Sequence, residues 1–355
     1  MRSSLSRLLG LFLLATAAAR GQNAPASVFD AIGTQVDKVF ASAKPALALV
    51  RAQQESFRTA GTGFFIDGDG TLLTTASLLL PPQAPFPADK PAVTVETGGK
   101  VLPAAIVGVD PRTGVAVLKV AGSHPYLTLP VAADAAAVKP ATPVVGAGFP
   151  FDLPAAPLFG MVTGCDSQCL GRFFATSHLR TTLAVAPGQL GGPVLDGKGN
   201  VLGMMVVSAD ERKTTYALPA AALGKVAEDL RLHGRVLHGW VGVGVDPGAD
   251  GVRIAQIFTG TPAAASGLEP GDTVLKIDGR AMRHPCDVID ASFFSRVGEE
   301  MSVVVDRGGK TLTFAFPVGE RPERMPVAVA RGAQPAPGAP AVHVLKASAV
   351  AASQD

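Results

Sequence analysis

The chain contains little charge, few aromatic residues and only three cysteines. Charged residues make up 17% of its 355 residues and aromatic residues 6%, whereas a typical globular domain has about 25% charged residues. Apolar residues make up 47%, which is enough to bury a core and excludes wholesale disorder. The net charge of +2 includes three arginines within the first 21 residues. The remainder therefore lacks the basic surplus that nucleic acid or an anionic membrane would require.

Long apolar runs are absent except near the amino terminus. There, Arg2 and Arg7 precede the apolar segment from Leu8 to Ala19, a pattern typical of a secretory signal peptide. The segment is too short to cross a bilayer. We therefore expect residues 1–21 to be a signal peptide and the protein to be exported, to the periplasm or outside the cell, with no membrane span.

A structural zinc site needs four ligands, and nothing near Cys165 and Cys169 supplies the other two. Cys165 and Cys169 lie four residues apart. In an oxidising compartment they are candidates for a local disulfide, with two free thiols as the alternative. We expect Cys286 to remain free in either case. The glycine-rich loop at 188–192 has no Lys-Ser/Thr of a phosphate-binding loop after it, and we expect neither a metal nor a cofactor.

Residues 28–232 are expected to form a first, mainly β domain. Helical spacing over 28–41 ends before Pro45, and a second helix is predicted over 219–232. Between them, short apolar segments alternate with Gly, Pro and Asp, which is typical of a sandwich or barrel. The clearest predicted strands are Ala46–Arg51, Gly63–Asp67, Leu72–Thr75, Ala92–Glu96, Val115–Val120, Pro143–Gly148, Val194–Leu195 and Val201–Val207.

Residues 238–318 are expected to form a smaller α+β domain with two helices, after a linker at 234–239. Thr261 and Gly267 bracket a short helix with an N-cap and a left-handed stop. Asp278-Gly279 indicates a hairpin, and a second helix is predicted over 286–297. Pro and Ala dominate residues 319–355 without periodicity, so we expect a disordered tail.

Several motifs in one order give this chain a resemblance to the HtrA (Deg) family of serine proteases. The segments are Gly61-Thr62-Gly63-Phe64-Phe65-Ile66, Val107-Gly108-Val109-Asp110-Pro111-Arg112-Thr113, Pro187-Gly188-Gln189-Leu190-Gly191-Gly192-Pro193 and Gly267-Leu268-Glu269-Pro270-Gly271-Asp272. The resemblance implies a trypsin-like double β-barrel followed by a PDZ domain. It also implies that the Trp240–Val243 loop, with Trp240, Val241, Gly242 and Val243, receives the C-terminus of a peptide.

The positions that hold the catalytic triad in this family differ here. The resemblance places the base at Ser77, the orienting acid at Gly114 and the nucleophile at Leu190. A trypsin-type triad needs a hydroxyl, an imidazole and a carboxylate. We therefore predict that the chain is not an enzyme, and that the backbone N–H groups of Gly188 and Leu190 form a vestigial oxyanion loop.

The expected function is that of an HtrA-like pseudoprotease. It would bind polypeptide C-termini or unfolded segments as a chaperone, adaptor or regulator, by strand addition in the PDZ groove. One alternative is a serine endopeptidase, as the family resemblance alone implies. Another is a structural partner in a mixed oligomer, because the family's trimers imply a homo- or hetero-trimer.

Overall fold

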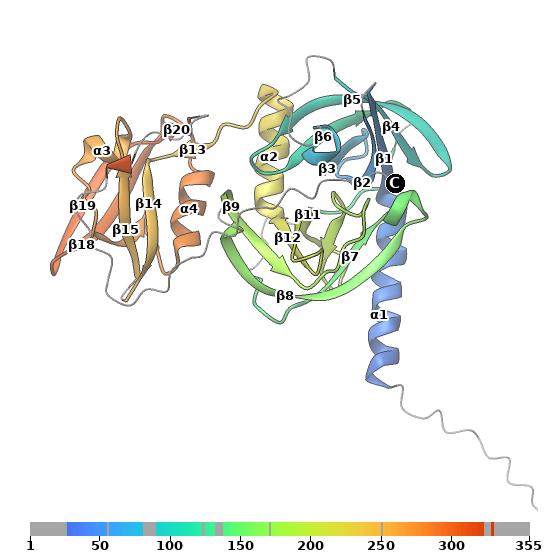
Figure 1. Ribbon diagram of the computed structural model, residues 1–355, viewed down its shortest axis with the longest axis horizontal. Coiled ribbons are helices and arrows are strands. Elements are labelled where there is room, and N and C mark those ends of the chain that lie inside the picture. Colours follow the sequence, from blue (N-terminus) through green and yellow to red (C-terminus); the bar gives the residue numbers. More distant parts are fainter. Residues whose placement is uncertain are drawn as a thin grey trace, which may run out of the picture.

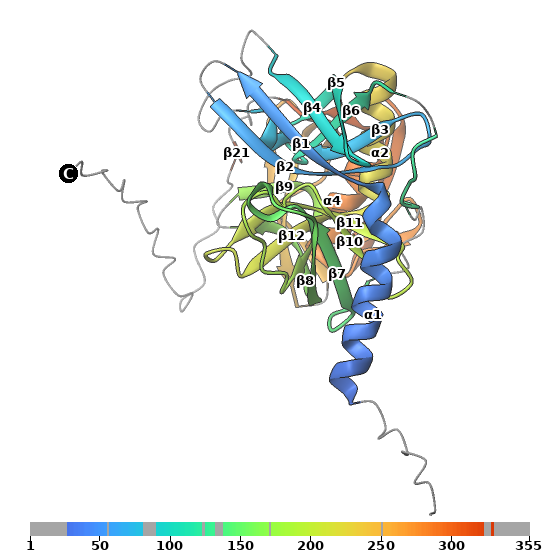
Figure 2. The same ribbon diagram turned by 90° about the vertical axis from the view of Figure 1, so that its right-hand side faces the viewer.

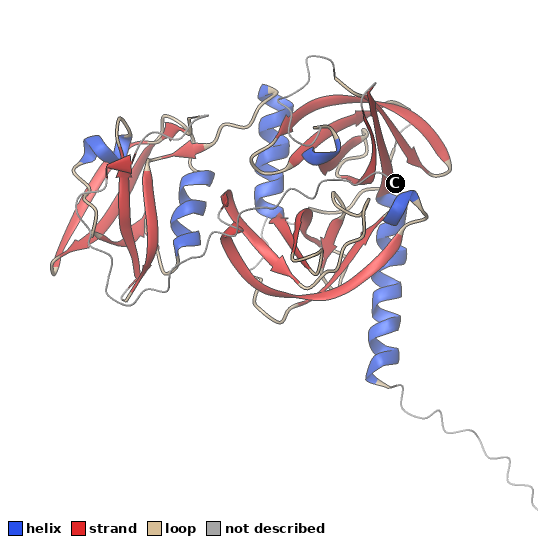
Figure 3. Cartoon of the chain, in the orientation of Figure 1, coloured by secondary structure: helices blue, strands red, loops and turns tan. Residues whose placement is uncertain are grey.

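The computed structural model is mainly β and describes residues 27–54, 57–80, 90–122, 125–131, 138–169, 172–249, 251–322 and 328–329. Two barrels with flanking helices form one part, and a smaller sheet with two helices forms the other (Figures 1 and 3). The predicted signal peptide lies outside the described residues. No helix among those described is long and apolar enough to cross a membrane.

The first barrel is a closed antiparallel sheet in the order β1-β2-β3-β6-β5-β4. The side chains of strand β6 contribute to two hydrophobic cores. Val115 and Val117 face a core shared with the second barrel, whereas Ala116 and Leu118 face the barrel interior, because successive strand side chains point to opposite faces. The strands are β1 (Leu47–Gln54), β2 (Phe57–Phe65), β3 (Thr71–Thr75), β4 (Ala92–Thr97), β5 (Lys100–Asp110) and β6 (Val115–Val120).

The second barrel closes in the order β10-β11-β12-β9-β8-β7. Its longest strands, β8 and β9, form a hairpin that reaches toward the smaller domain (Figure 1). The sequence did not predict this hairpin, because glycines and small polar residues interrupt its apolar positions. The strands are β7 (Pro143–Gly148), β8 (Ala156–Cys169), β9 (Arg172–Thr181), β10 (Pro193–Leu195), β11 (Val201–Ala209) and β12 (Thr214–Pro219).

Two α-helices flank the barrels, and both begin and end at recognisable signals. Helix α1 (Val28–Ala43) starts at Ser27, which forms a capping box with Asp30, and it projects from the barrels at its first turns (Figure 2). Helix α2 (Ala220–His233) ends at Gly234 in the left-handed conformation. Three short 3₁₀ turns complete the domain: η1 (Lys44–Ala46), η2 (Ala76–Leu78) and η3 (Pro150–Asp152).

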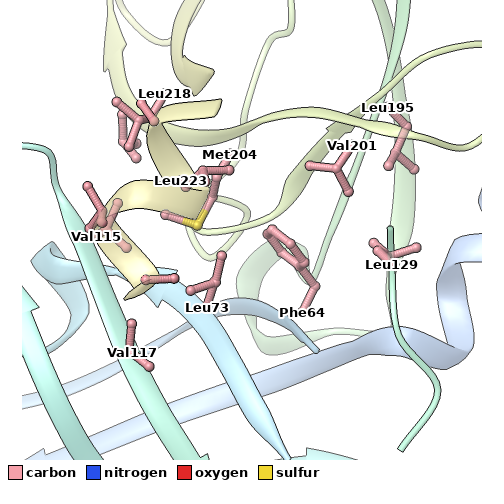
Figure 4. Close-up of a cluster of buried hydrophobic side chains, with 14 of the residues drawn as sticks. Phe64, Leu73, Val115, Val117, Leu129, Leu195, Val201, Met204, Leu218 and Leu223 are labelled. Atoms are coloured by element: carbon pink, nitrogen blue, oxygen red, sulfur yellow. The ribbon is translucent and has the colours of Figure 1, made fainter. Parts of the chain in front are cut away.

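The shared core joins both barrels and α2. Phe64 and Leu73 come from the first barrel, Met204 and Leu218 from the second, and Leu223 from α2 (Figure 4). All five side chains are buried. This core fixes the two barrels against each other, so a cleft between them has rigid walls.

The smaller domain has its own core and a sheet in the order β14-β15-β16-β18-β19. The predicted hairpin at Asp278-Gly279 joins β16 to β17, with positive φ at both residues. The elements are β13 (Gly239–Trp240), β14 (Val243–Gly248), β15 (Gly251–Phe258), α3 (Pro262–Ser266), β16 (Thr273–Ile277), β17 (Arg280–Ala281), α4 (Pro285–Phe294), β18 (Glu300–Arg307), β19 (Lys310–Pro317), β20 (Gly319–Glu320) and β21 (Ala328–Val329).

The start of the predicted tail is part of the fold. Strand β20 pairs with β13, the Arg321 N–H donates to the His238 carbonyl, and Arg112 donates to the Pro322 carbonyl at 2.7 Å. The boundary at residue 319 is therefore corrected to beyond 322. The sequence missed this because a two-residue strand has no periodicity. Most of residues 323–355 lie outside the described part of the chain.

Candidate functional site

A cleft of about 260 Å³ lies between the two barrels. It is lined from the first barrel by Gly61 and Ser77, and from the second by Gly188, Leu190 and Arg212. The turn between β5 and β6 adjoins this region, because the Ala76 N–H donates to the Gly114 carbonyl at 2.8 Å. Of the three positions that the family resemblance singled out, Ser77 and Leu190 line the cleft, and Gly114 is bonded to the residue before Ser77.

The loop at 186–192 is held in place by backbone hydrogen bonds. The Thr62 hydroxyl donates to the Gly188 carbonyl at 2.7 Å, and the Thr62 N–H donates to the Leu190 carbonyl at 3.2 Å. Gly188 has φ +93°, and a Cβ there would lie 2.4 Å from the Phe149 carbonyl oxygen. Among the described residues, neither the Gly188 nor the Leu190 N–H has an acceptor. The loop therefore leaves two backbone N–H groups unbonded at residues that line the cleft.

Several hydroxyl side chains line the cleft, but few charged ones do. Ser77 is exposed, and its hydroxyl lies 3.1 Å from that of Thr75. Leu190 is half-buried and offers neither hydroxyl nor thiol. Of the described residues that line the cleft, Arg212 is the sole ionisable one. Among the described residues, the lining of the cleft contains no imidazole or carboxylate.

His178, the nearest histidine in sequence to the loop, lies elsewhere. It is buried, its Nδ1 lies 2.9 Å from the Thr176 carbonyl oxygen, and its ring stacks on Phe174 at 3.9 Å. Burial lowers its pKa to about 4. Because this pKa is low, the imidazole is neutral near pH 7. His178 lines a separate cavity together with Gly114 and is absent from the lining of the cleft that holds Leu190.

A second concave site, of about 340 Å³, lies between β14 and α4. Strand β14 is at the edge of its sheet and, within the described part of the chain, pairs with β15 alone. Trp240, Val241 and Val243 line this groove, together with Val288 and Ile289 of α4. An edge strand beside an apolar helix face is the arrangement that accepts an extended peptide by strand addition.

Gly242 shapes the entrance of the groove. It has φ +89°, and a Cβ there would lie 2.2 Å from Cβ of Thr261. Thr261 caps α3, accepting from the Ala264 N–H, and the Gly242 carbonyl accepts from the Phe258 N–H at 2.9 Å. Gly242 is absent from the groove lining, unlike its neighbours. Its part is to turn the chain so that the backbone of the loop can face a ligand.

The first domain contributes a wall of the groove that was not predicted from the sequence. Ser167, Phe174 and Ala175 of the β8–β9 hairpin line the groove, and so does Arg321. The contact depends on how two domains pack, and no local pattern encodes that. Helix α4 of the smaller domain lies beside β9 of this hairpin (Figure 1).

Asp290 accepts three hydrogen bonds from β9. The donors are the Thr176 hydroxyl at 2.6 Å, the Ser177 N–H at 2.7 Å and the Ser177 hydroxyl at 2.5 Å. Thr176 and Ser177 are both buried. A carboxylate that satisfies three buried donors is a strong local anchor, and it fixes α4 on the β8–β9 hairpin.

The predicted disulfide pair is separated. Cys165 and Cys169 both lie on β8 and are free thiols. Four residues of extended strand span about 13 Å, whereas a disulfide requires Cα atoms within about 7 Å. Cys286 lies beside Cys165 instead, with its Sγ 3.6 Å from the Cys165 carbonyl oxygen. The described residues contain no group of three or more His, Cys, Asp or Glu placed for a metal.

Comparison with known proteins identifies both domains. Residues 61–204 match the trypsin-like peptidase domain family, and residues 239–318 match the PDZ domain family. The chain is 31% identical over 294 residues to the protein HhoB of Synechocystis sp., covering 74% of this chain and 67% of that one. The chain belongs to the HtrA family. This confirms the predicted fold of a trypsin-like domain followed by a PDZ domain.

Other HtrA relatives and structures agree. The chain is 31% identical over 297 residues to a Halomonas elongata protein named "Probable periplasmic serine endoprotease DegP-like", covering 77% of this chain and 59% of that one. Among solved structures, the HtrA-type protease AlgW with tripeptide has a TM-score of 0.67 and 25% identity, covering 81% of this chain and 98% of that chain. The serine endoprotease from Yersinia pestis has a TM-score of 0.58 at 23% identity, covering 81% and 98%, and shows the shared fold.

The prediction that the chain is not an enzyme is contradicted by these relatives, since they are named serine endoproteases and the HtrA family points to protease activity. The prediction rested on the side chains at positions 77, 114 and 190. Their identities exclude a trypsin-type triad at those positions, which is one arrangement of catalytic groups. The chain spans about three fifths of the length of several of these relatives.

Proposed function

We propose that this HtrA-family chain binds the C-termini of polypeptides, or unfolded segments, in the groove between β14 and α4, as a chaperone, adaptor or regulator. The observation that carries the proposal is the open edge of β14 facing the apolar side of α4 across that groove. Backbone groups along such an edge bind a strand regardless of its sequence, and pockets for alternate side chains select it.

The residues around the groove support a C-terminal ligand with an apolar last residue. Trp240, Val241 and Val243 line the groove next to Gly242, where the chain turns with positive φ. Consecutive N–H groups in a turn form an anion-binding concavity. Val288 and Ile289 offer an apolar pocket for the last side chain. The HtrA-type protease AlgW has been solved with a tripeptide and with a decapeptide, which supports the same class of ligand here.

The test is a titration of the full chain with short peptides that end in an apolar residue, each as the free acid and as the amide. We expect Kd values in the micromolar range for the acids, or roughly −8 kcal/mol, and binding at least tenfold weaker for the amides. Ile289→Glu should weaken the acid form at least tenfold. Val101→Glu, at an exposed β5 position, is the matched control and should leave binding unchanged. Equal binding of acid and amide would reject the proposal.

The relatives favour a second function, endopeptidase activity in the trypsin-like domain. The cleft would supply the Gly188 and Leu190 N–H donors for a developing oxyanion and the exposed Ser77 hydroxyl. Leu190 has no group to attack a carbonyl, so hydrolysis would have to use a different nucleophile from the one at that position in a trypsin-type triad. Casein cleavage by the full chain that is lost in Ser77→Ala, but kept in Val101→Glu, would establish this function. Cleavage that persists in Ser77→Ala would reject this role of Ser77.

The same relatives support export. Several are named periplasmic endoproteases, and the arginines and apolar residues of 1–21 have the pattern of a signal peptide. We propose a periplasmic location and assembly as a homo- or hetero-trimer. Cell fractionation of the full-length chain, followed by sizing of the periplasmic fraction, tests both.

A further inference from the structure

Two cysteines from different domains meet where α4 packs on β8. Cys286 is in the first turn of α4, and Cys165 is on β8. The Cys286 Sγ lies 3.6 Å from the Cys165 carbonyl oxygen. One turn further along α4, Asp290 is bonded to Ser177 on β9, so the position of Cys286 over the hairpin is fixed by a buried anchor rather than by the cysteines alone.

The surroundings of the pair favour reaction at Cys165. Cys165 is exposed, whereas Cys286 is half-buried. A hydrogen bond from the Cys286 side chain holds the pKa of Cys165 below its ordinary value. The same hydrogen bond and burial raise the pKa of Cys286. Because the thiolate is the nucleophile, Cys165 is the thiol that attacks first.

We propose that Cys165 and Cys286 form a redox site in which a disulfide joins the trypsin-like domain to the PDZ domain. The oxidant is a disulfide donor, either a protein or a small molecule. The Cys165 thiolate attacks one sulfur of the donor, forming a mixed disulfide and releasing one donor thiolate. Cys286 then loses its proton and attacks the Cys165 sulfur, releasing the second thiolate. The donor gains two electrons and the two cysteine protons, and leaves as two thiols.

The site adjoins the peptide groove. Ser167 and Val288, each two residues beyond one of the cysteines, both line that groove. A disulfide would therefore hold one wall from each domain at a fixed separation, and reduction would leave Asp290 as the anchor. The redox site does not depend on the proposed peptide binding, since it rests on the approach of the Cys286 Sγ to the Cys165 backbone and on the Asp290 anchor.

Tryptic mapping of the oxidised full chain distinguishes the possible bridges. Cys165 and Cys169 share one tryptic peptide, 120–172, because Pro140 follows Lys139, while Cys286 lies in peptide 284–296. The chain is incubated with oxidised and reduced glutathione, free thiols are alkylated in acid-quenched denaturant, and the digest is analysed by mass spectrometry without reduction. We expect the two peptides to be linked, two hydrogen masses lighter than their sum, and to separate on addition of dithiothreitol.

Cys169→Ser is the matched control, because it removes a thiol from the same strand and peptide. We expect the linked peptides to persist in Cys169→Ser and to disappear in Cys165→Ser. Three alkylated thiols, a bridge within peptide 120–172, glutathione adducts without linked peptides, or linkage between chains would each overturn the proposal. Loss of the link in Cys169→Ser would also overturn it, since Cys286 would then pair with Cys169. The wild-type and Cys169→Ser maps suffice even where Cys165→Ser does not fold.

Discussion

The cleft between the barrels and the groove beside α4 differ in how their walls are made. The cleft is the smaller, at about 260 Å³ against about 340 Å³, and hydrogen bonds within one domain fix its loop through Thr62. The groove has an open strand edge, and its walls come from both domains. The width of the groove therefore depends on the relative position of the two domains. The width of the cleft depends on the core that the two barrels share within one domain.

The largest effect that would separate the two sites is expected from Gly242→Ala. A left-handed φ costs a non-glycine residue about 1–3 kcal/mol, and the clash with Thr261 costs about 1–3 kcal/mol more. We expect the melting of the PDZ domain to shift to lower temperature and peptide binding to be lost. Differential scanning calorimetry checks this, and an unchanged PDZ transition would show that the loop does not need its left-handed residue.

The next effect belongs to the trypsin-like domain and depends on pH. Buried His178 has a pKa of about 4, whereas an unfolded histidine has about 6.5. The unfolded state therefore binds the proton first, so stability is fully present above pH 6.5 and is lost as the pH falls toward 4. The loss amounts to about 3 kcal/mol. Urea unfolding between pH 7 and 4 should show this slope, and His178→Gln should flatten it. A slope that is unchanged in His178→Gln would assign it to other groups.

A smaller effect is expected at the contact between the domains. Asp290→Ala leaves the donors of Thr176 and Ser177 without their acceptor, which costs about 1–3 kcal/mol. Asp290→Asn keeps an oxygen acceptor and should restore most of the loss. We expect faster hydrogen exchange in α4 and β9 of Asp290→Ala, with the cleft loop at 186–192 unaffected. Equal exchange in the two variants would mean that the anchor is elsewhere.

The smallest effect is expected at the cleft itself. Leu190 is half-buried and packs at the edge of a core in the second barrel. Leu190→Ala should lower stability by about 1 kcal/mol, below the range for a fully buried leucine, and leave peptide binding in the groove unchanged. Leu190→Met is the control of similar volume. Weaker peptide binding in Leu190→Ala alone would show that the two sites are coupled.

Local signals in the sequence predicted the elements best. Thr261 and Gly267 bracket α3 as expected, and the strands Val115–Val120 and Pro143–Gly148 have their predicted bounds. Helix α4 spans Pro285–Phe294 instead of 286–297, because Ser295 is already extended. Helix caps, turns and the alternation of apolar and polar residues each involve only a few neighbouring residues. They can therefore be recognised in a single sequence.

Contacts between the domains could not be predicted from the sequence. The family resemblance singled out positions 77, 114 and 190, and of these Ser77 and Leu190 line the cleft, whereas Gly114 lines a separate cavity. The walls that Phe174 and Arg321 add to the groove, and the approach of Cys286 to Cys165, depend on how the PDZ domain docks on the β8–β9 hairpin. The spacing of Cys165 and Cys169 suggested a local bridge, but an extended strand keeps them apart.

Hydrogen exchange of the full chain, with and without a saturating free-acid peptide, tests most directly the claim that polypeptide ends bind in the PDZ groove. Amides that enter a strand pairing or contact a carboxylate exchange more slowly. The account predicts slower exchange over residues 240–245 and unchanged exchange over residues 186–190. Slower exchange over 186–190 alone, or binding with no change over 240–245, would contradict it.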